Sequence, residues 1–311
     1  MKYACAAVSA ELLLSVSLAA LNLPLLHAEP RCPGNVAILP FRLVMRSRII
    51  VPVVINHSGP YDFLVDTGAW FTTLEPSLAV ELHLKTQGTA EVVGVGFSEK
   101  SSFTQIDLLE TGSHAIGNHV AEVLDLQGLQ APGLHIRGVL GGEFLGHFDM
   151  LMDYRHSVLC LDDTKVMRTR VKGVRVELTI PVPAADGVPS TGLLLIPVHL
   201  SGARARQLLL ALDSGAQMPF LYHPNQYLDP GVLMSEPVNG HGADGVKQAF
   251  SILQPQDMQI GLLRFHGISF VAPSRLWQSS AASQVDGLLP TALFWRVFVS
   301  YADHFAVLDP R

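Results

Sequence analysis

Two short stretches each place an aspartate after a run of apolar residues and before a Thr-Gly or Ser-Gly pair. The first is Phe63-Leu64-Val65-Asp66-Thr67-Gly68-Ala69, and the second is Leu209-Leu210-Ala211-Leu212-Asp213-Ser214-Gly215-Ala216, 147 residues further along. Two carboxyls held roughly 3 Å apart cannot both ionise, so they share one proton. One is then a base and the other an acid, as amide hydrolysis by water requires. The spacing predicts that Asp66 and Asp213 meet as a catalytic pair.

For either stretch alone, the alternative is a strand-end aspartate that only stabilises a turn. Repetition of the surrounding sequence favours the pair. Val51-Pro52-Val53 and Ile196-Pro197-Val198 precede the two aspartates, and Gly138-Val139-Leu140-Gly141 and Gly287-Leu288-Leu289-Pro290 follow them. The order of these matches indicates a duplicated unit of about 120 residues, with too few copies for a solenoid. We expect an N-terminal lobe at 36–165, a connecting segment at 166–190 and a C-terminal lobe at 191–311.

Short β-branched runs separated by turn residues predict strands rather than a helical bundle. Ile49–Ile55 and Tyr61–Val65 are expected strands, and Pro76 stands at a plausible first position of a short helix. The expected fold is therefore all-β, with a few short helices and two lobes that enclose a cleft. Gly68 and Gly215 lack a Cβ, which allows a tight turn that brings backbone N–H groups to the carboxylates.

The paired motifs resemble those of the aspartic proteases. Val65-Asp66-Thr67-Gly68-Ala69 with Val139-Leu140-Gly141, and Leu212-Asp213-Ser214-Gly215-Ala216 with Leu288-Leu289, are similar to retropepsin-type enzymes, here with two retropepsin-like barrels fused as in a pepsin-like pseudo-dimer. The resemblance implies an aspartic endopeptidase that acts on peptides or proteins as a monomer, without metal or cofactor. It also implies that the Thr67 and Ser214 hydroxyls hydrogen-bond across the two lobes, while Ala69 and Ala216 keep the approach narrow.

Two Gly-punctuated segments resemble the flaps of these enzymes, which fold over a bound peptide and shield the reacting water. Their expected hinges are Gly94 and Gly96 in the first lobe and Gly240 and Gly242 in the second. Ordinary exposed hairpins are the alternative. Neither segment carries a tyrosine, so the flap tyrosine of the pepsin type is missing.

The second lobe departs from the family pattern at two places. Pro290 stands where glycine is usual, and Met218-Pro219 replaces the polar Thr72-Thr73. Either change could displace the second loop by a fraction of an ångström, to which such chemistry is sensitive. A peptide-binding protein that keeps the fold but has lost most turnover is therefore the alternative function.

The first 28 residues have the features of a secretory signal peptide, with an apolar core at Leu12–Leu26 and a small residue at Ala28. An uncleaved anchor is the alternative. We expect an exported, periplasmic or secreted, protein with no stable membrane span after cleavage. A net charge of −6 and the lack of a basic stripe argue against nucleic acid as a partner.

The cysteines and histidines carry weaker signals. An exported protein can keep a disulfide, and Cys32 and Cys160 allow one pairing, but Cys160 in an apolar strand could equally be a buried small hydrophobe. The 13 histidines include no metal-binding motif, so we expect no metal site. His114 and His119 are expected at the surface.

Overall fold

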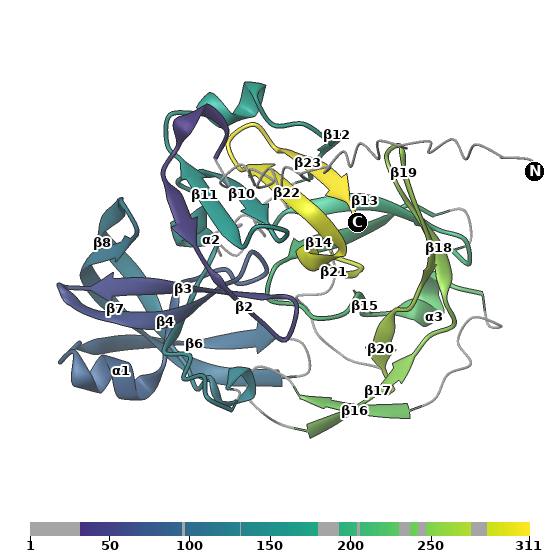
Figure 1. Cartoon of the computed structure of the whole chain (residues 1–311). Coiled ribbons are helices and arrows are strands. Elements are labelled where there is room, and N and C mark those ends of the chain that lie inside the picture. The colour runs from purple at the N-terminus through teal and green to yellow at the C-terminus, as the bar shows by residue number, and fades with distance from the viewer. Residues whose placement is uncertain are drawn as a thin grey trace, which may run out of the picture. The chain divides into compact units, whose positions relative to one another are not determined.

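The computed structural model describes residues 32–94, 97–130, 132–179, 193–203, 206–229, 237–241, 247–274 and 285–311. The predicted signal peptide and residues 180–190 of the predicted connecting segment lie outside these ranges. The described residues form three β-sheets with short helical segments between strands (Figure 1). The predicted all-β class with a few short helices is confirmed. None of the described helices is long and apolar enough to cross a membrane.

The first sheet has eight strands, and β4 (Ser58–Val65) leads to Asp66. β4 pairs antiparallel with β3 (Arg48–Ile55) and parallel with β9 (Gly138–Leu140). Alternate residues of β3, namely Val51, Val53 and Ile55, are fully buried because one face of the strand covers the core. The remaining strands are β2 (Arg42–Val44), β5 (Thr73–Leu74), β6 (Thr86–Gly94), β7 (Phe97–Thr111) and β8 (His114–Val123).

The second sheet has nine strands and repeats this arrangement around Asp213. β14 (Leu208–Asp213) pairs antiparallel with β13 (Leu195–Leu200) and parallel with β21 (Gly287–Pro290). The matches found in the sequence thus correspond to equivalent strand pairings. The remaining strands are β15 (Phe220–Leu221), β16 (Pro237–His241), β17 (Lys247–Ile252), β18 (Gln256–Ile260), β19 (Leu263–Ile268) and β20 (Val271–Pro273).

The third sheet combines strands from both halves of the chain. β10 (Asp149–Asp153) pairs antiparallel with β22 (Phe294–Ser300), with Leu151 opposite Phe298. Both of these side chains are buried, so the two halves share a hydrophobic cluster here. The sheet has six strands, and the others are β1 (Ile38–Pro40), β11 (Val158–Asp162), β12 (Val174–Glu177) and β23 (Phe305–Pro310). Residues 174–177 of the expected connecting segment thus form an edge strand.

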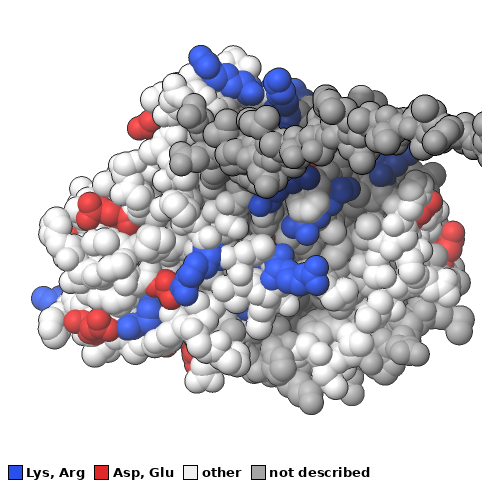
Figure 2. Space-filling model, in the orientation of Figure 1, with Lys and Arg blue, Asp and Glu red and all other residues white. Residues whose placement is uncertain are grey.

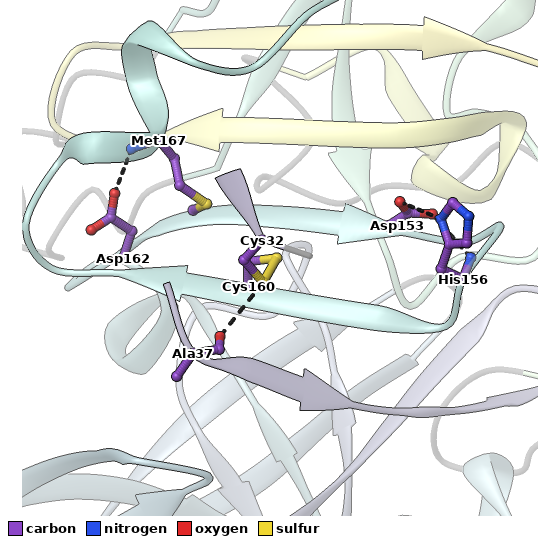
Figure 3. The surroundings of a disulfide bond; sticks show 7 residues. All are labelled: Cys32, Ala37, Asp153, His156, Cys160, Asp162 and Met167. Carbon is purple, nitrogen blue, oxygen red and sulfur yellow. Dashed lines mark hydrogen bonds and ion pairs between the residues drawn. A yellow bond between two sulfur atoms is a disulfide. The ribbon is translucent and has the colours of Figure 1, made fainter. Parts of the chain in front are cut away.

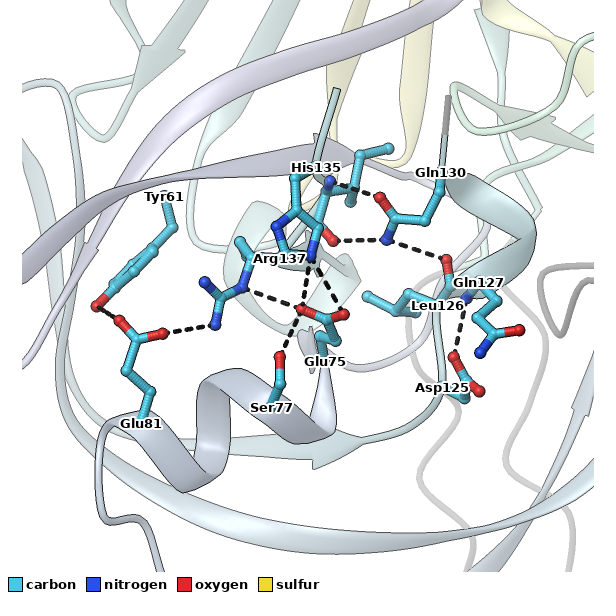
Figure 4. A network of polar contacts seen from close by, with 11 residues as sticks. Tyr61, Glu75, Ser77, Glu81, Asp125, Leu126, Gln127, Gln130, His135 and Arg137 are labelled. Carbon is cyan, nitrogen blue, oxygen red and sulfur yellow. Dashed lines mark hydrogen bonds and ion pairs between the residues drawn. The ribbon is translucent and has the colours of Figure 1, made fainter. Parts of the chain in front are cut away.

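The helical segments are all one or two turns long. Arg137, just before β9, is the centre of a polar network that contacts Glu75 and Glu81 at the two ends of α1 (Figure 4). Its guanidinium also lies over the Tyr61 ring, 5.5 Å from the centroid. The network thus links α1 to β4, which leads to Asp66, and to β9 beside it. The segments are α1 (Pro76–Glu81), α2 (Gly142–Leu145), α3 (Pro224–Tyr227) and the 3-10 turns η1 (Pro33–Asn35), η2 (Gln127–Leu129), η3 (Val166–Thr169) and η6 (Thr291–Leu293).

Cys32 and Cys160 form a disulfide, which the sequence had left open (Figure 3). Both residues are buried beside Met167 in the cluster under the third sheet. Asp162, at the end of β11, accepts a hydrogen bond from the Met167 N–H at 2.7 Å. The disulfide therefore fixes the beginning of the described chain to β11 of the shared sheet.

One expectation about the histidines is wrong. His119 is 3% exposed, because β8 places it on the inner face of the sheet, where its ring packs edge-on against Phe144. Its Nε2 has no hydrogen-bond partner among the described residues. Burial lowers the pKa of His119 to about 4, so the ring is neutral at pH 7. His114, at the start of the same strand, is half-buried.

Candidate active site

Asp66 and Asp213 stand at the ends of equivalent strands. The Asp66 N–H donates to the Leu140 carbonyl at 3.0 Å, which extends the β4–β9 pairing by one residue. Asp213 is the last residue of β14 and lies opposite Pro290 of β21. In both lobes an apolar strand ends at the aspartate, flanked by a buried parallel strand. Asp213 is buried, whereas Asp66 is half-buried.

Backbone N–H groups of the two aspartate loops donate hydrogen bonds to both carboxylates. The Gly68 N–H donates to Asp66 Oδ1 at 2.8 Å. The N–H groups of Gly215 and Ala216 donate to Asp213 Oδ1 at 2.7 and 2.9 Å. Such bonds orient a carboxylate and favour its charged form. The N–H groups of Gly68 and Gly215 thus approach the carboxylates, as expected for residues without a Cβ, while the Ala69 N–H faces the Asp66 carbonyl at 3.4 Å.

Each of the two glycines also faces the carboxyl of the opposite lobe. A Cβ built on Gly68 would lie 2.6 Å from Asp213 Oδ2, and one built on Gly215 would be closer still to Asp66 Oδ2. Any side chain at either position would push the two loops apart. The glycines are therefore required for the close approach of the lobes, in addition to the tight turn that the sequence predicts.

Thr67 and Ser214 link the lobes reciprocally. The Thr67 N–H donates to Ser214 Oγ at 3.1 Å, and the Ser214 N–H donates to Thr67 Oγ1 at 3.0 Å. Each hydroxyl then donates to a carbonyl of the other lobe, Thr67 Oγ1 to Leu212 at 2.6 Å and Ser214 Oγ to Val65 at 2.7 Å. All four bonds are buried, and they fix the relative positions of the two aspartates.

The two carboxyls lie close enough to affect each other's ionisation. A hydrogen bond joins them, and burial raises the pKa of both. The pKa of Asp213 lies well above its usual value because burial is reinforced by the charge of Asp66. For Asp66 the N–H groups of Gly68 and Ala69 oppose the effect of burial. Because the two carboxyls interact, their titration belongs to both residues together.

Arg48 is a residue near the pair that the sequence reasoning missed. It begins β3, and its charge acts on both Asp66 and Asp213, while burial lowers its own pKa. Its Nη1 donates to the Leu129 carbonyl at 3.4 Å, and its Nε has no partner among the described residues. A lone charged residue before the apolar strand Ile49–Ile55 was the available signal. Arg48 favours a negative charge on the pair.

Two tyrosines below the pair were also missed. Tyr154 follows β10 and Tyr301 follows β22, 147 positions apart like the aspartates. The Tyr154 hydroxyl hydrogen-bonds to Thr291 Oγ1 at 2.5 Å, and the Tyr301 hydroxyl is buried without a partner among the described residues. Burial raises the pKa of both hydroxyls, so both rings are neutral. The floor of the site thus comes from the shared sheet.

The expected flaps are hairpins where the structure describes them. β6 and β7 pair up to Gly94 opposite Phe97, and β16 and β17 pair Gly240 with Gln248. Gly96 and Gly242 lie outside the described residues. A Cβ on Gly240 would lie 2.8 Å from the Phe250 ring, so its glycine allows close packing within the hairpin. Among the described residues, no three His, Cys, Asp or Glu side chains are grouped to hold a metal ion.

Comparisons with known proteins agree with this arrangement. Residues 51–144 match the aspartyl protease family. An aspartic proteinase from Irpex lacteus has a similar structure with a TM-score of 0.53 and 11% identity, over 88% of this chain and 97% of that one. A retropepsin-like aspartic protease from Rickettsia conorii is also similar, with a TM-score of 0.30 and 21% identity, over 40% of this chain and 88% of that one. A comparison with curated proteins gave no match. The predicted resemblance is confirmed: the chain has the two-lobed, all-β fold of the aspartic proteases, and its N-terminal lobe matches the aspartyl protease family.

Proposed function

We propose that this protein is an aspartic endopeptidase in which Asp66 and Asp213 activate one water between them. The ionised carboxylate takes a proton from the water as it attacks the peptide carbonyl, and the protonated carboxyl gives its proton to the carbonyl oxygen. The proton taken from the water then passes to the leaving nitrogen, and the second carboxyl regains a proton from the tetrahedral intermediate as the C–N bond breaks. The reaction needs no covalent intermediate, metal or cofactor. The half-buried Asp66 is open to such a water, and Arg48 favours the ionised form of the pair.

The contact between the two carboxyls is the observation that carries this proposal. Two aspartates buried against each other destabilise a fold unless they share a proton, because each raises the cost of charging the other. Here the buried Thr67–Ser214 bonds hold them in that position. A geometry that is costly to maintain and supported from both lobes is expected at a functional site. Gly94 and Gly96 in one hairpin, and Gly240 and Gly242 in the other, would then help cover the bound peptide.

Single substitutions at the two aspartates test the proposal. Asp66→Asn and Asp213→Asn should each lower hydrolysis of an unfolded, carboxymethylated protein at least 1,000-fold by removing the shared proton site, roughly the loss seen when such paired groups are broken. Asp163→Asn, at an exposed position outside the site, is the matched control and should retain full activity. Full activity in either dyad variant would disprove the shared pair.

Pro290 supports the second candidate, a peptide-binding protein with weak or no turnover. In the first lobe, a Cβ on Gly141 would collide with the Phe71 carbonyl, whereas the second lobe carries a ring at the equivalent place. Pro290 lies opposite Asp213 in the β14–β21 pairing. The proline therefore affects the position of the aspartate in the less regular second lobe. Tight binding of a statine-type inhibitor without any cleavage between pH 3 and pH 7 would favour this candidate over the endopeptidase.

We also propose that the protein is exported and acts as a monomer. The Cys32–Cys160 disulfide supports export, because disulfides persist mainly in oxidising compartments. Two complementary aspartates in one chain support a monomer, since no second copy is needed to complete the pair. Amino-terminal sequencing of the exported protein and its mass under active conditions test the two points. A start at Met1 would oppose cleavage of residues 1–28, and activity confined to a dimer would oppose the monomer.

A further inference from the structure

A cavity of about 300 Å³ lies beside the second aspartate loop and is lined from both lobes. One wall is the β2–β3 turn, Met45, Arg46 and Ser47. The facing wall comprises Gln217 and Met218, which follow the Asp213–Ala216 loop, and Pro290, Ala292 and Leu293. Gln217 Nε2 lies 3.0 Å from Met45 Sδ, so the walls touch at one point. Its position places the cavity within reach of a side chain a few residues from the bond held at the dyad.

The cavity coincides with the place where the second lobe departs from the first. Gly141 packs against the backbone of Phe71. The strand pairings make Phe220 the counterpart of Thr73, so Met218 corresponds to Phe71 and not to Thr72, as the sequence had suggested. Pro290 and Met218, the counterparts of Gly141 and Phe71, both line the cavity. The substitutions that distinguish the second lobe are therefore features of this cavity's wall.

The β2–β3 turn presents its side chains to the cavity. Met45 and Arg46 both have positive φ, 51° and 66°, as in the β3–β4 turn at Asn56 and His57, and the Ser47 N–H donates to the Val44 carbonyl at 3.2 Å. Tight hairpin turns favour this backbone conformation, which fixes the direction of the side chains at the tip. Ser47 is 5% exposed, and its Oγ has no hydrogen-bond partner among the described residues. Ser47 also lines the cavity, and rotation about its Cα–Cβ bond would turn the unpartnered hydroxyl toward a ligand there.

The charge of the cavity is positive. Arg46 forms no ion pair with a described residue, and no Asp or Glu lines the cavity. Figure 2 shows several Arg and Lys side chains over the middle of this face, while most of its acidic side chains lie toward the left and right. The chain as a whole carries a net charge of −6, so the positive charge at this cavity does not follow from the overall composition. Met45 and Met218, 50% and 44% exposed, supply apolar walls for a methylene stem.

We propose that this cavity selects an acidic side chain of the substrate, whose carboxylate binds the Arg46 guanidinium and accepts a hydrogen bond from Ser47 Oγ. The proposal rests on the endopeptidase function above and gives its substrate class: peptides with Glu or Asp at one fixed position near the cleaved bond. A guanidinium and a hydroxyl suit a carboxylate because both donate, and a charge-assisted bond is stronger than a neutral one. Gln217 completes the wall by holding Met45 in place.

Peptides that differ only by Glu or Gln test the proposal. In a set with one cleavable bond and otherwise neutral side chains, Glu is moved through four positions on each side of that bond. One position should favour Glu over Gln about tenfold in kcat/KM, a typical value for one charge-assisted bond. The preference should disappear below about pH 4, where the substrate carboxyl is protonated, and weaken in 1 M salt.

Charge reversal assigns the preference to Arg46. Arg46→Glu should favour Lys over Gln at the same position, and Ser47→Ala should reduce the preference for Glu without reversing it. Arg264→Glu, an exposed arginine on β19, is the matched control and should keep the preference for Glu. Each variant should unfold at the same temperature as the wild type to within a few degrees.

The outcomes separate this proposal from the function on which it rests. Cleavage that depends on Asp66 but is equal for Glu and Gln at every position would overturn the acidic preference and leave the endopeptidase intact. If no peptide is cleaved, the same pairs with a reduced, uncleavable bond are compared by fluorescence polarisation. Tenfold tighter binding of the Glu peptide that Arg46→Glu abolishes would support the cavity, and equal binding would overturn it.

Discussion

Thr67 and Ser214 exchange backbone N–H to hydroxyl bonds across the two lobes at 3.1 and 3.0 Å, and both side chains are buried. The contact joins residues that occupy the same place in each repeat. It is closed off from solvent, so each bond that is lost leaves a polar group unsatisfied in the interior. The relative position of the aspartates therefore depends on two hydroxyls that touch neither a substrate nor a reacting atom.

Removal of either hydroxyl should destabilise the protein. Thr67→Val keeps the shape but leaves the Ser214 N–H and the Leu212 carbonyl without partners, which should lower the free energy of unfolding by about 2–3 kcal/mol. Ser214→Ala should have a similar effect, and Ser214→Thr, which keeps the hydroxyl, should not. Urea denaturation measures these changes. Ser77→Ala, which removes an exposed bond to Glu75, serves as the control and should stay within about 0.5 kcal/mol of the wild type.

Alanine at the two dyad glycines should impair catalysis more than stability. Gly68→Ala and Gly215→Ala each place a Cβ against the opposite carboxyl, so they should lower kcat at least about 100-fold by displacing one aspartate. Gly117→Ala is the matched control, since its Cβ would lie 3.4 Å from the nearest atom. Steady-state kinetics on one peptide, with circular dichroism to verify folding, distinguish the variants. Wild-type kcat in Gly68→Ala would contradict the close approach described above.

Arg48 should determine the pH at which kcat/KM falls on the acidic side of its pH profile. Its charge lowers the pKa of Asp66, which must be ionised to act as base. Arg48→Met should therefore raise that pKa and move the acidic limb of kcat/KM upward, by roughly one pH unit for a nearby partly buried charge. The full profile of kcat/KM against pH gives the shift. Arg42→Met, on the same hairpin but paired with Asp62 away from the dyad, should leave the limb in place.

His119 should make the fold less stable in acid. Its pKa is about 4 in the folded protein against 6.5 when unfolded, so the unfolded chain binds an extra proton between these values. Its contribution to stability is complete above pH 6.5 and falls by about 3 kcal/mol toward pH 4. Glu143, whose pKa burial raises to about 7, acts in the opposite direction over part of the range.

The comparison of wild type with His119→Phe isolates the histidine. The difference in unfolding free energy between the two proteins should grow as pH falls from 6.5 to 4, because only the wild type must keep a proton off a buried ring. Denaturation midpoints across this range measure it. His199→Gln, at an exposed position on β13, should run parallel to the wild type. A constant difference between wild type and His119→Phe would show that the ring does not titrate as described.

Local patterns were sufficient to predict much of this fold. The β-branched run before the first turn and the apolar run before Asp66 became β3 and β4, and the Gly138 and Gly287 elements became the parallel strands beside each aspartate. These elements depend on the alternation of apolar and polar residues and on the residue types that favour turns, both of which can be read from a single sequence. The repeat also predicted that the two aspartates meet, since equivalent strands in fused lobes end at equivalent places.

Features that depend on distant contacts were not predictable in this way. Periodicity does not say that β10 pairs with β22, which lies in the other half, nor that Arg48 faces the dyad. His119 was misplaced because the local sequence does not show which face of β8 is covered, and the ring that covers His119 belongs to the distant Phe144. The cavity at Arg46 likewise appears only when the β2–β3 turn is set against a loop about 170 residues away.

The shared six-stranded sheet has a consequence for how the chain is made. β10 pairs with β11 on one side and with β22 on the other, and β22 lies more than 140 residues later in the chain. As the ribosome adds residues in order, the first half is complete long before Phe294–Ser300 exists, so β10 must wait with one edge open. An exposed apolar edge pairs readily with other chains. The nascent protein thus has an unpaired edge until Phe294–Ser300 has been made, and a holding chaperone would act at that edge.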